Sequence, residues 1–553
     1  MKKIVLGVFF FCAIQLHAQY TFEHIDIWSG SNSGSPKYIT KFNGQLLFQA
    51  VEITPSFKKL YKSDGTTAGT EIIATNLNGG AGYSPESFYE FNGELYFSGF
   101  ISGVGMELCK TDGTDAGTVL VKDIRTGASS GLDFNSNDDN QLFVEYNGEL
   151  YFRASTNSSI ELWKTNGTES GTISVKNFED ATNGAPIFMS KPGKNILGVV
   201  YNGLLYFAVN RGSESELWKT DGTTANTELV RSSLKNISEM IIFNNELIFV
   251  SGDDSTTGGR ELWSTDGTTA GTTIKHDIFP NNLNPAFGLS SNPSYLTIFN
   301  NELYFKARSY NGTSGQIIGS ELWKTDGTTA SLVKDIDTDN LASGLNIPNF
   351  TVYNNELYFV ASDNTTADFE LWKTDGTENG TVKTVTATDT GESIEFSNAI
   401  VYANKLFYFD SQQLWVTDGT ASGTEKLTGS SEEIISVSSS SLVEFQNKIW
   451  FQGNKTGNGS ELTSLQDAST LDVNEIETDT IILYPNPTTE ILALKGLQQD
   501  RSYTMYDVSG KRIISGTLSV VNSQLDVSNL QTGYYFLQIS QGKKSKTLTF
   551  IKQ

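Results

Sequence analysis

The stretch Glu261–Thr272 reads ELWSTDGTTAGT, and close copies of it recur along the chain. ELWKTNGTESGT stands at 161–172, ELWKTDGTTANT at 216–227 and ELWKTDGTENGT at 370–381. Further copies begin at 107 and 321, looser ones at 60 and 413, and a remnant, ELTSL, at 461. A phrase repeated at this spacing indicates the structural unit of a repeat array.

A second phrase precedes every copy: an aromatic residue, an Asn or near equivalent, then a hydrophobic run. It reads FNGELYF at 91, FNNELYF at 299 and FQNKIWF at 445, and its Asn residues, Asn43 to Asn447, recur every 42 to 56 residues. Asn-Gly and Asp-Gly accept the positive φ angles of tight hairpin turns. Each unit therefore predicts four short strands joined by such turns, as in one blade of a propeller.

Neighbouring residues in ELYF and ELW are both apolar, although neighbours in a strand point to opposite faces of the sheet. Sheets that are covered on both faces, as stacked blades are, explain this composition. We expect an all-β protein: a large β-propeller of four-stranded blades followed by a small C-terminal β-sandwich. Nine units predict nine blades, with eight possible if one unit is absorbed irregularly.

The two ends of the array predict how it closes. The ninth unit lacks a fourth strand, whereas TFEHIDIWSGSNSGSPKYITKF (21–42) aligns with EIIATNLNGGAGYSPESFYEF (71–91), a fourth strand followed by the next first strand. Thr21–Ile27 is thus an orphan fourth strand. We expect it to pair beside Ile449–Phe451 or Glu461–Leu465, because the open edges of an unclosed array promote aggregation.

The 553-residue chain carries a formal charge of −24 and has a pI near 4.6. Nucleic-acid binding needs a basic surface, so no nucleic-acid partner is expected. Residues 1–18 have the basic start, apolar run and small last residue of a secretory signal peptide. No later segment is long and apolar enough to predict a transmembrane span. Removing the signal leaves one cysteine, Cys109, at a Trp position of the repeat, where we expect it to fill the core.

After an acidic, polar linker at 466–480, the sequence changes character at 481–553. Alternating runs such as YYFLQI and KTLTFI, separated by Ser-Gly and Thr-Gly turns, predict the small sandwich. The segment carries YPNPT at 484–488, YDVSGK at 506–511, LQTGYY at 530–535 and lysines at 543, 544 and 546. In this order the motifs resemble the type A C-terminal sorting domain of the type IX secretion system of Bacteroidota.

That resemblance implies a protein that the type IX secretion machinery exports, and that is secreted or held at the outer cell surface. The residues that carry the resemblance are taken as the sorting signal: Tyr484, Pro485, Asn486, Pro487, Gly510, Lys511, Gly533, Tyr534, Lys543, Lys544 and Lys546. The repeats, assigned as a domain to 19–465, resemble the ELWxxDGT-repeat (hyalin-like) proteins of the same bacteria. That family supplies no agreed activity and no catalytic residues.

The repeated polar residues have a functional and a structural interpretation, and the structural one is favoured for each. Asp266 and its equivalents offer the oxygen ligands of a Ca²⁺ loop. An Asp-Gly turn, with the carboxylate accepting backbone N–H groups, is preferred because Asn166 replaces one of them. The Glu of each ELW phrase is expected to pair with a lysine of a neighbouring blade rather than to serve in catalysis. The Trp side chains are expected to pack between blades.

Segments that do not repeat are the better place to seek function, because loops on a rigid scaffold carry specificity. These insertions are 128–142, 179–197, 279–295 and 308–320. In the first, Asp138 and Asp139 are candidate Ca²⁺ ligands, and no other metal or cofactor is expected. His24 and His276 lie in different units, so no His-based triad or zinc site is predicted and no catalytic residue is assigned.

The favoured function is a non-enzymatic, exported adhesion module whose loops bind an unidentified glycan, protein or surface polymer. One alternative is a secreted polysaccharide hydrolase with a carboxylate pair at the propeller mouth, since such pairs have no fixed spacing in sequence. Another is a structural surface protein stiffened by Ca²⁺. Acids from different blades within about 5–10 Å of one another would favour the hydrolase.

Overall fold

The computed structural model describes most of the chain: residues 20–51, 58–73, 85–132, 140–141, 143–157, 159–178, 185–187, 189–191, 194–253, 259–279, 290–311, 316–339, 343–363, 368–429, 434–437, 441–467, 481–497, 500–508, 511–520, 523–541 and 544–553. Contacts divide the chain into two compact units, Phe22–Leu465 and a second formed mainly by Gln466–Gln553. The predicted signal peptide and most of the predicted linker lie outside the described residues. The described part is all-β apart from one helical turn, α1 (Ala387–Thr390).

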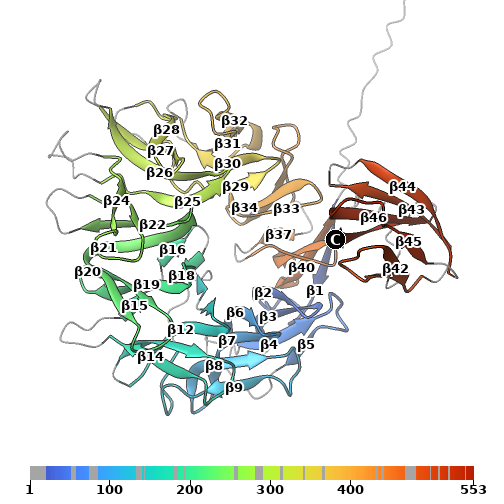
Figure 1. Ribbon diagram of the computed structural model, residues 1–553, viewed down its shortest axis with the longest axis horizontal. Helices are drawn as coiled ribbons and strands as arrows, with labels where there is room; N and C mark the ends of the chain where they lie inside the picture. Colours follow the sequence, from blue (N-terminus) through green and yellow to red (C-terminus); the bar gives the residue numbers. More distant parts are fainter. Residues whose placement is uncertain are drawn as a thin grey trace, which may run out of the picture. The chain divides into compact units, whose positions relative to one another are not determined.

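The larger unit is a series of antiparallel sheets that follow one another in chain order (Figure 1). Six of its sheets have four strands, paired in the order in which the chain makes them. The first three are β2 (Lys37–Phe42), β3 (Gln45–Val51), β4 (Lys58–Ser63) and β5 (Glu71–Ile73); β6 (Glu86–Phe91), β7 (Glu94–Ile101), β8 (Gly105–Thr111) and β9 (Val119–Lys122); and β11 (Phe143–Tyr146), β12 (Glu149–Ser155), β13 (Ile160–Thr165) and β14 (Ile173–Asn177). The other three are β25 (Ser294–Phe299), β26 (Glu302–Asn311), β27 (Gln316–Thr325) and β28 (Ala330–Lys334); β29 (Thr351–Tyr353), β30 (Glu356–Ala361), β31 (Glu370–Thr374) and β32 (Val382–Val385); and β33 (Ser397–Tyr402), β34 (Lys405–Asp410), β35 (Gln413–Thr417) and β36 (Glu425–Lys426).

Repeat units four and five depart from this plan. Their strands form one eight-stranded sheet, because β21 (Glu228–Phe243) runs without a break from the fourth strand of one unit into the first strand of the next. The other strands of this sheet are β15 (Ala185–Ile187), β18 (Gly198–Tyr201), β19 (Leu204–Arg211), β20 (Glu214–Thr220), β22 (Glu246–Asp253), β23 (Glu261–Thr265) and β24 (Thr273–His276). Two of the insertions add a small sheet of β10 (Asn140–Gln141), β17 (Lys194–Ile196) and β16 (Met189–Lys191).

The predicted turn chemistry is present in each unit. Asn43 and Gly44 both have positive φ angles in the first hairpin, as do Asn300 and Asn301 in a later one, which is the backbone of a type I′ turn. These turns set the register of the first two strands: Phe299 of β25 lies opposite Glu302 of β26. Between the second and third strands, Phe305 of β26 lies opposite Trp323 of β27. Because successive residues of a strand point to opposite faces, each sheet presents large apolar side chains on both faces.

Apolar clusters join each sheet to its neighbour. One cluster takes Phe91 and Leu108 from the second sheet and Phe152 and Trp163 from the third. Equivalent clusters join the first sheet to the second and continue through the series as far as the seventh and eighth units. Cys109 is fully buried in the first of these, which confirms that it fills the core.

The N-terminal strand completes the last sheet. β1 (Tyr20–Ile25) lies beside β40 (Gly459–Asp467), which pairs with β39 (Lys448–Lys455); β37 (Ile434–Val437) and β38 (Val443–Phe445) pair with the other edge of β39. This confirms the pairing expected of the orphan strand. One cluster then joins Ile25 and Trp450 of this last sheet to Phe48 and Tyr61 of the first. The series of sheets therefore packs back on its own beginning, although no sheet of described strands is itself closed into a barrel.

The C-terminal unit contains two antiparallel sheets over one apolar core. The first holds β41 (Ile482–Tyr484), β42 (Ile491–Lys495) and β45 (Gln524–Asp526); the second holds β44 (Arg512–Leu518), β43 (Arg501–Asp507), β46 (Gly533–Gln541) and β47 (Lys544–Lys552). Leu492 and Leu525 from one sheet meet Met505, Leu537 and Phe550 from the other.

Candidate functional site

The Glu of the ELW phrase anchors the loop that leads to the next sheet. Glu107 in β8 is fully buried and accepts hydrogen bonds from the backbone N–H groups of Ile124 (2.9 Å) and Gly131 (2.7 Å). Both donors lie after β9, in the loop that crosses to the third sheet. A buried carboxylate needs such partners, because an unsatisfied buried charge is very costly.

The same arrangement recurs in three more units. Glu261 accepts from the N–H groups of Ile278 (3.0 Å) and Ser291 (2.8 Å). Glu321 accepts from Ile336 (2.9 Å) and Gly344 (2.5 Å). We call Glu107, Glu261, Glu321 and Glu461 the loop-anchoring glutamates, the last being described below.

The expectation that these glutamates pair with lysines of a neighbouring blade is therefore wrong. The lysine that follows ELW or ELC instead pairs with a glutamate of the adjacent, preceding strand of its own sheet, as in Lys110–Glu94 (2.9 Å) and Lys324–Glu302 (2.9 Å). The backbone N–H groups of an irregular loop have no ladder partner, so a fixed buried acceptor satisfies them. The donors named for Glu107 and Glu321 are all backbone N–H groups. The sequence motif alone therefore did not reveal that these glutamates anchor loops.

Three units use other partners. Glu161 accepts from the hydroxyls of Ser159 (2.6 Å) and Ser174 (2.5 Å). Glu216 pairs with Arg211 (3.0 Å) of the same sheet, and Glu370 with Lys383 of the same sheet.

The remnant ELTSL retains the glutamate that closes the series. Glu461 is fully buried, and its two carboxylate oxygens accept from different N–H groups of the N-terminal segment: Oε2 from Ile27 (2.9 Å) and Oε1 from Gly34 (2.5 Å). Ile27 and Gly34 thus play the part that Ile124 and Gly131 play for Glu107. The N-terminal segment supplies both the missing strand and the missing anchored loop.

Burial dominates the protonation of these acids. Desolvation raises the pKa of Glu107, Glu261 and Glu461 to about 7 and that of Glu321 to about 8, although the backbone hydrogen bonds oppose the shift. A raised pKa is often a mark of a catalytic acid. Here the carboxylates face backbone N–H groups inside the protein, so the shift reports burial in the scaffold.

The Asp of the DGT turn has the predicted structural role. Asp266 Oδ1 accepts from the backbone N–H (2.8 Å) and hydroxyl (2.8 Å) of Thr268, and Asn166 Oδ1 makes the same two bonds to Thr168 (3.0 and 2.7 Å). Hydrogen bonds from Thr268 lower the pKa of Asp266. A turn that forms equally with Asn does not depend on charge, and these hydrogen bonds are those expected of the predicted Asp-Gly turn.

The tryptophans confirm the prediction of packing between sheets. Trp163, Trp263, Trp323, Trp372 and Trp415 are buried, each in a cluster shared with the preceding repeat unit. Basic side chains lie over the rings of some of them, as Arg231 does over Trp263 (5.6 Å to the centroid). None of these five offers an open stacking platform for a sugar.

The sheet of the eighth unit, β33 to β36, departs from the repeated residue pattern. Gln413 replaces the usual Glu, and Tyr408 and Asp410 stand at positions where the unit before it has Phe359 and Ala361. Both side chains are buried, and among the described residues no hydrogen-bond partner is found for the Tyr408 hydroxyl. Burial raises the pKa of Asp410 to about 6.

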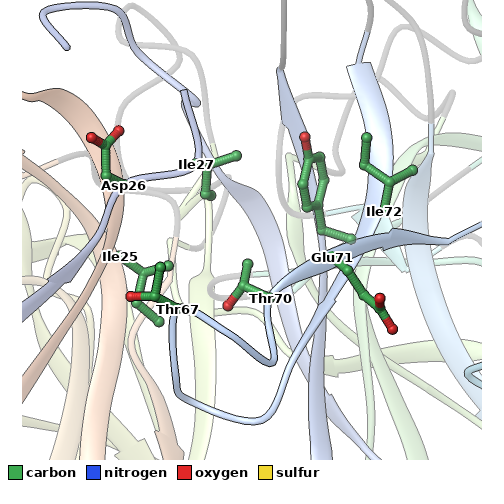
Figure 2. Close-up of a pocket in the computed structure, with 8 residues that line it drawn as sticks. Ile25, Asp26, Ile27, Thr67, Thr70, Glu71 and Ile72 are labelled. Carbon is green, nitrogen blue, oxygen red and sulfur yellow. The ribbon is translucent and has the colours of Figure 1, made fainter. Parts of the chain in front are cut away.

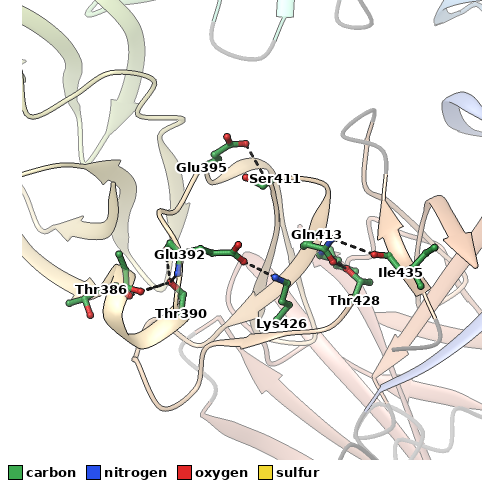
Figure 3. Close-up of polar contacts among 11 residues, drawn as sticks. Thr386, Thr390, Glu392, Glu395, Ser411, Gln413, Lys426, Thr428 and Ile435 are labelled. Carbon is green, nitrogen blue, oxygen red and sulfur yellow. Dashed lines mark hydrogen bonds and ion pairs between the residues drawn. The ribbon is translucent and has the colours of Figure 1, made fainter. Parts of the chain in front are cut away.

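Polar contacts surround this sheet on the side of α1 (Figure 3). Glu392 pairs with Lys426 (2.7 Å), and Glu395 accepts a hydrogen bond from the backbone N–H of Ser411 (3.3 Å). Gln413 accepts from the Thr428 hydroxyl (2.9 Å). The acids here hold the loop after α1 against the hairpin.

A pocket of about 210 Å³ lies where the N-terminal segment meets the first sheet (Figure 2). Its lining includes Ile25 and Asp26 from the N-terminal segment and Tyr61, Thr70 and Glu71 from the first sheet. The side chains of Asp26 and Glu71 point in opposite directions in Figure 2, so they do not converge on one ligand. The pocket marks the seam between the last sheet and the first.

The candidate Ca²⁺ ligands Asp138 and Asp139 lie outside the described residues, as do parts of all four insertions. Across the residues that the structure does describe, no three or more His, Cys, Asp or Glu side chains are grouped to hold a metal ion. No described helix is long and apolar enough to cross a membrane.

In the C-terminal unit, the YPNP segment is tied to the last strand. Asn486 Oδ1 accepts from the backbone N–H of Ile551 (2.9 Å), and the Thr488 N–H donates to the Ile551 carbonyl (2.9 Å). Tyr484 and Tyr534 are exposed. Pro485 and Pro487 flank Asn486, Lys511 precedes β44, Gly533 begins β46, and Lys544 and Lys546 lie in β47. Gly510 and Lys543 lie outside the described residues. The sorting roles of individual residues stay a prediction.

Comparison with known proteins identifies this C-terminal unit. Residues 482–553 match the family model of the secretion system C-terminal sorting domain, which confirms the predicted type IX sorting domain. The protein is therefore one that is secreted to the cell surface or beyond it. A search of curated protein sequences finds no match to the chain.

Solved structures show only distant likeness. Puromycin hydrolase is 14% identical, with 70% of this chain and 59% of that chain covered and a TM-score of 0.31. Oligopeptidase B from Leishmania major is 11% identical, with 71% and 54% covered and a TM-score of 0.34. The extracellular domain of a one component system from B. thetaiotaomicron is 10% identical, with 94% and 87% covered and a TM-score of 0.23. The chain spans less than two thirds of the first two proteins, and scores this low support no conclusion about activity.

Proposed function

We propose that the repeat region is a β-propeller that works as an exported binding module for a glycan, a protein or a surface polymer. Nine repeat units supply its blades, two of them joined through β21. Support comes from the apolar clusters that link successive sheets and from the N-terminal strand in the last sheet. The ELWxxDGT family remains the resemblance that best describes this region.

One observation carries the proposal of binding over catalysis. The repeated acids and aromatics, which are the residues that a sugar-cleaving or sugar-stacking site would use, are engaged in holding the scaffold. Glu107 and Glu261 bind backbone N–H groups, and Trp163 is buried between sheets. Variable loops on a rigid, repeated frame are the usual arrangement of a recognition protein.

Binding of the purified protein to glycan and extracellular-matrix arrays tests this function. We expect selective capture of one ligand class. Release of reducing ends from a panel of polysaccharides would instead support a hydrolase, and selective capture together with such release would show that the ligand is also a substrate. A chelator-dependent fall in melting temperature would support the Ca²⁺-stiffened alternative. Failure to bind any array member, without hydrolysis, would refute the proposal.

A further inference from the structure

The first strands of several successive repeat units contact one another. β2, β6, β11, β25, β29 and β33 are edge strands of their sheets. Contacts join β38 to β2, β2 to β6, β11 to β18 and β21 to β25. Tyrosine hydroxyls add hydrogen bonds between successive first hairpins, as from Tyr353 to the Asn404 carbonyl (2.8 Å) and from Tyr402 to the Asn447 carbonyl (2.6 Å).

One position on these strands has the same place in every unit: it precedes the buried aromatic and lies opposite a buried Leu or Ile of the second strand. In units four to eight it is apolar, and these residues form what we call the inner apolar row: Val200, Ile242, Ile298, Val352 and Val401. Four of the five are 39–47% exposed, and Val200 is half-buried.

In the remaining units the same position is charged and exposed. It is Glu444 in the ninth unit, Lys41 in the first, Glu90 in the second and Glu145 in the third. Because the last sheet packs on the first, these four positions are also consecutive. The edge along which the sheets converge is thus divided into one apolar side and one side that carries three carboxylates and one ammonium group.

Single exposed β-branched residues need no functional explanation. Val119, Ile173 and Val382 are such residues on the fourth strands β9, β14 and β32, with exposed fractions of 39–46%, and they lie in the second, third and seventh units. The inner apolar row differs because the same position is apolar in five consecutive units. Contiguous exposed apolar surface with a charged border is typical of an interaction site.

We infer that the inner apolar row and the acidic positions beside it form a docking surface for a peptide segment that presents apolar side chains on one side and lysine or arginine on the other. This inference rests on the proposed propeller. The apolar side would cover Ile298, Val352 and Val401. The cationic side would face Glu90, Glu145 and Glu444, whose combined negative charge exceeds the single positive charge of Lys41. An acidic apolar segment would meet like charge, so complementarity selects the basic one.

The test uses short synthetic amphipathic peptides and the full chain. We expect a leucine–lysine peptide to bind in calorimetry, and a leucine–glutamate peptide of the same length to bind at least about tenfold more weakly. The triple variant Ile298→Thr, Val352→Thr and Val401→Thr should weaken binding of the leucine–lysine peptide at least about tenfold. Thr keeps the β-propensity of these exposed positions, and circular dichroism and melting verify folding.

The matched control is the triple variant Val119→Thr, Ile173→Thr and Val382→Thr, which removes equally exposed residues from the outer strands and should leave binding unchanged. Absence of binding by the leucine–lysine peptide, or equal losses in both triple variants, would overturn the inference. Array binding separates the two proposals: a ligand captured equally by wild type and both variants, without peptide binding, leaves the binding module intact and removes the docking surface.

Discussion

Replacing Glu461 tests how the series of sheets is closed. Glu461→Ala removes the acceptor of two buried backbone N–H groups, those of Ile27 and Gly34. An unsatisfied buried donor costs about 1–3 kcal/mol, so the two together cost about 2–6 kcal/mol. Burial of the carboxylate, which raises its pKa to about 7, offsets part of this cost. We expect a net loss of about 2–4 kcal/mol, a large fraction of the about 5–15 kcal/mol that stabilises a typical protein.

Glu461→Gln should cause only part of this loss of stability. Ile27 and Gly34 use different carboxylate oxygens, so a glutamine of the same shape satisfies one N–H group and turns its own NH₂ group toward the other. We expect about half the loss of the alanine variant. Glu71→Ala is the matched control beside the same seam, because Glu71 makes an exposed ion pair with Lys62, and pairs of this kind contribute about 0–1 kcal/mol.

Hydrogen exchange measured by mass spectrometry, together with urea unfolding, provides the assay. Amides of residues 20–36 should exchange faster in Glu461→Ala while amides of the third to seventh units keep their protection. Wild-type exchange in residues 20–36 of the alanine variant would refute the anchoring role. Uniformly faster exchange in every unit would also contradict it, since that result indicates global destabilisation rather than an open seam.

Four further outcomes follow from the same geometry. Gly131→Ala should lower the melting temperature in differential scanning calorimetry, since a Cβ there would lie 2.5 Å from a Glu107 carboxylate oxygen. Gly93→Ala meets no neighbouring atom and carries only the strain of its positive φ angle of 77°, so it should lower the melting temperature less. The loop-anchoring glutamates have folded pKa values raised from 4.5 to about 7–8, so their protonation favours the folded state fully below pH 4.5. This contribution to the free energy of unfolding should be lost as the pH rises from 4.5 to about 8, and Glu461→Gln should flatten that pH profile. Asp266→Asn should leave the melting temperature unchanged and Asp266→Ala should lower it, because Asn166 already makes the same turn. A chain lacking residues 481–553 should accumulate in the periplasm on cell fractionation, and its normal appearance outside the cell would contradict the sorting role.

Local chemistry made much of the fold predictable. Hairpin turns at Asn43 and Asn300 need residues that accept positive φ, so the sequence marks them directly. The orphan N-terminal strand was predictable because Thr21–Ile27 aligns with other fourth strands. The uninterrupted strand β21 was not predictable, because only a few residues between Glu228 and Phe243 decide whether the chain turns there or continues as a strand.

The role of the glutamates could not be predicted from residue types alone. A lysine partner for Glu107 was expected because opposite charges attract, yet its donors are the backbone N–H groups of Ile124 and Gly131. Any residue except proline offers such a donor, so the loop sequence carries little signal. The recurring Asp-Ile pair before a later Gly, at Asp26-Ile27 and Gly34 and again at Asp335-Ile336 and Gly344, was the one available clue.

The seam at Glu461 is the junction with the least support from the chain itself. Glu107 and Gly131 are 24 residues apart, whereas Glu461 and Gly34 are 427 apart, although the hydrogen bonds are alike. Closing the longer loop in an otherwise unfolded chain costs about 2.5 kcal/mol more, from the logarithmic dependence of closure entropy on length. The folded sheets between them reduce that cost by fixing where the two ends lie. The ninth unit has also changed to suit its separate strand: Thr463 stands where other units have Trp, and His24 of β1 makes a hydrogen bond to its hydroxyl (2.9 Å). The unit whose repeat phrase is most degraded is thus the one whose fourth strand comes from elsewhere in the chain, and it keeps the Glu that accepts the N–H groups of Ile27 and Gly34.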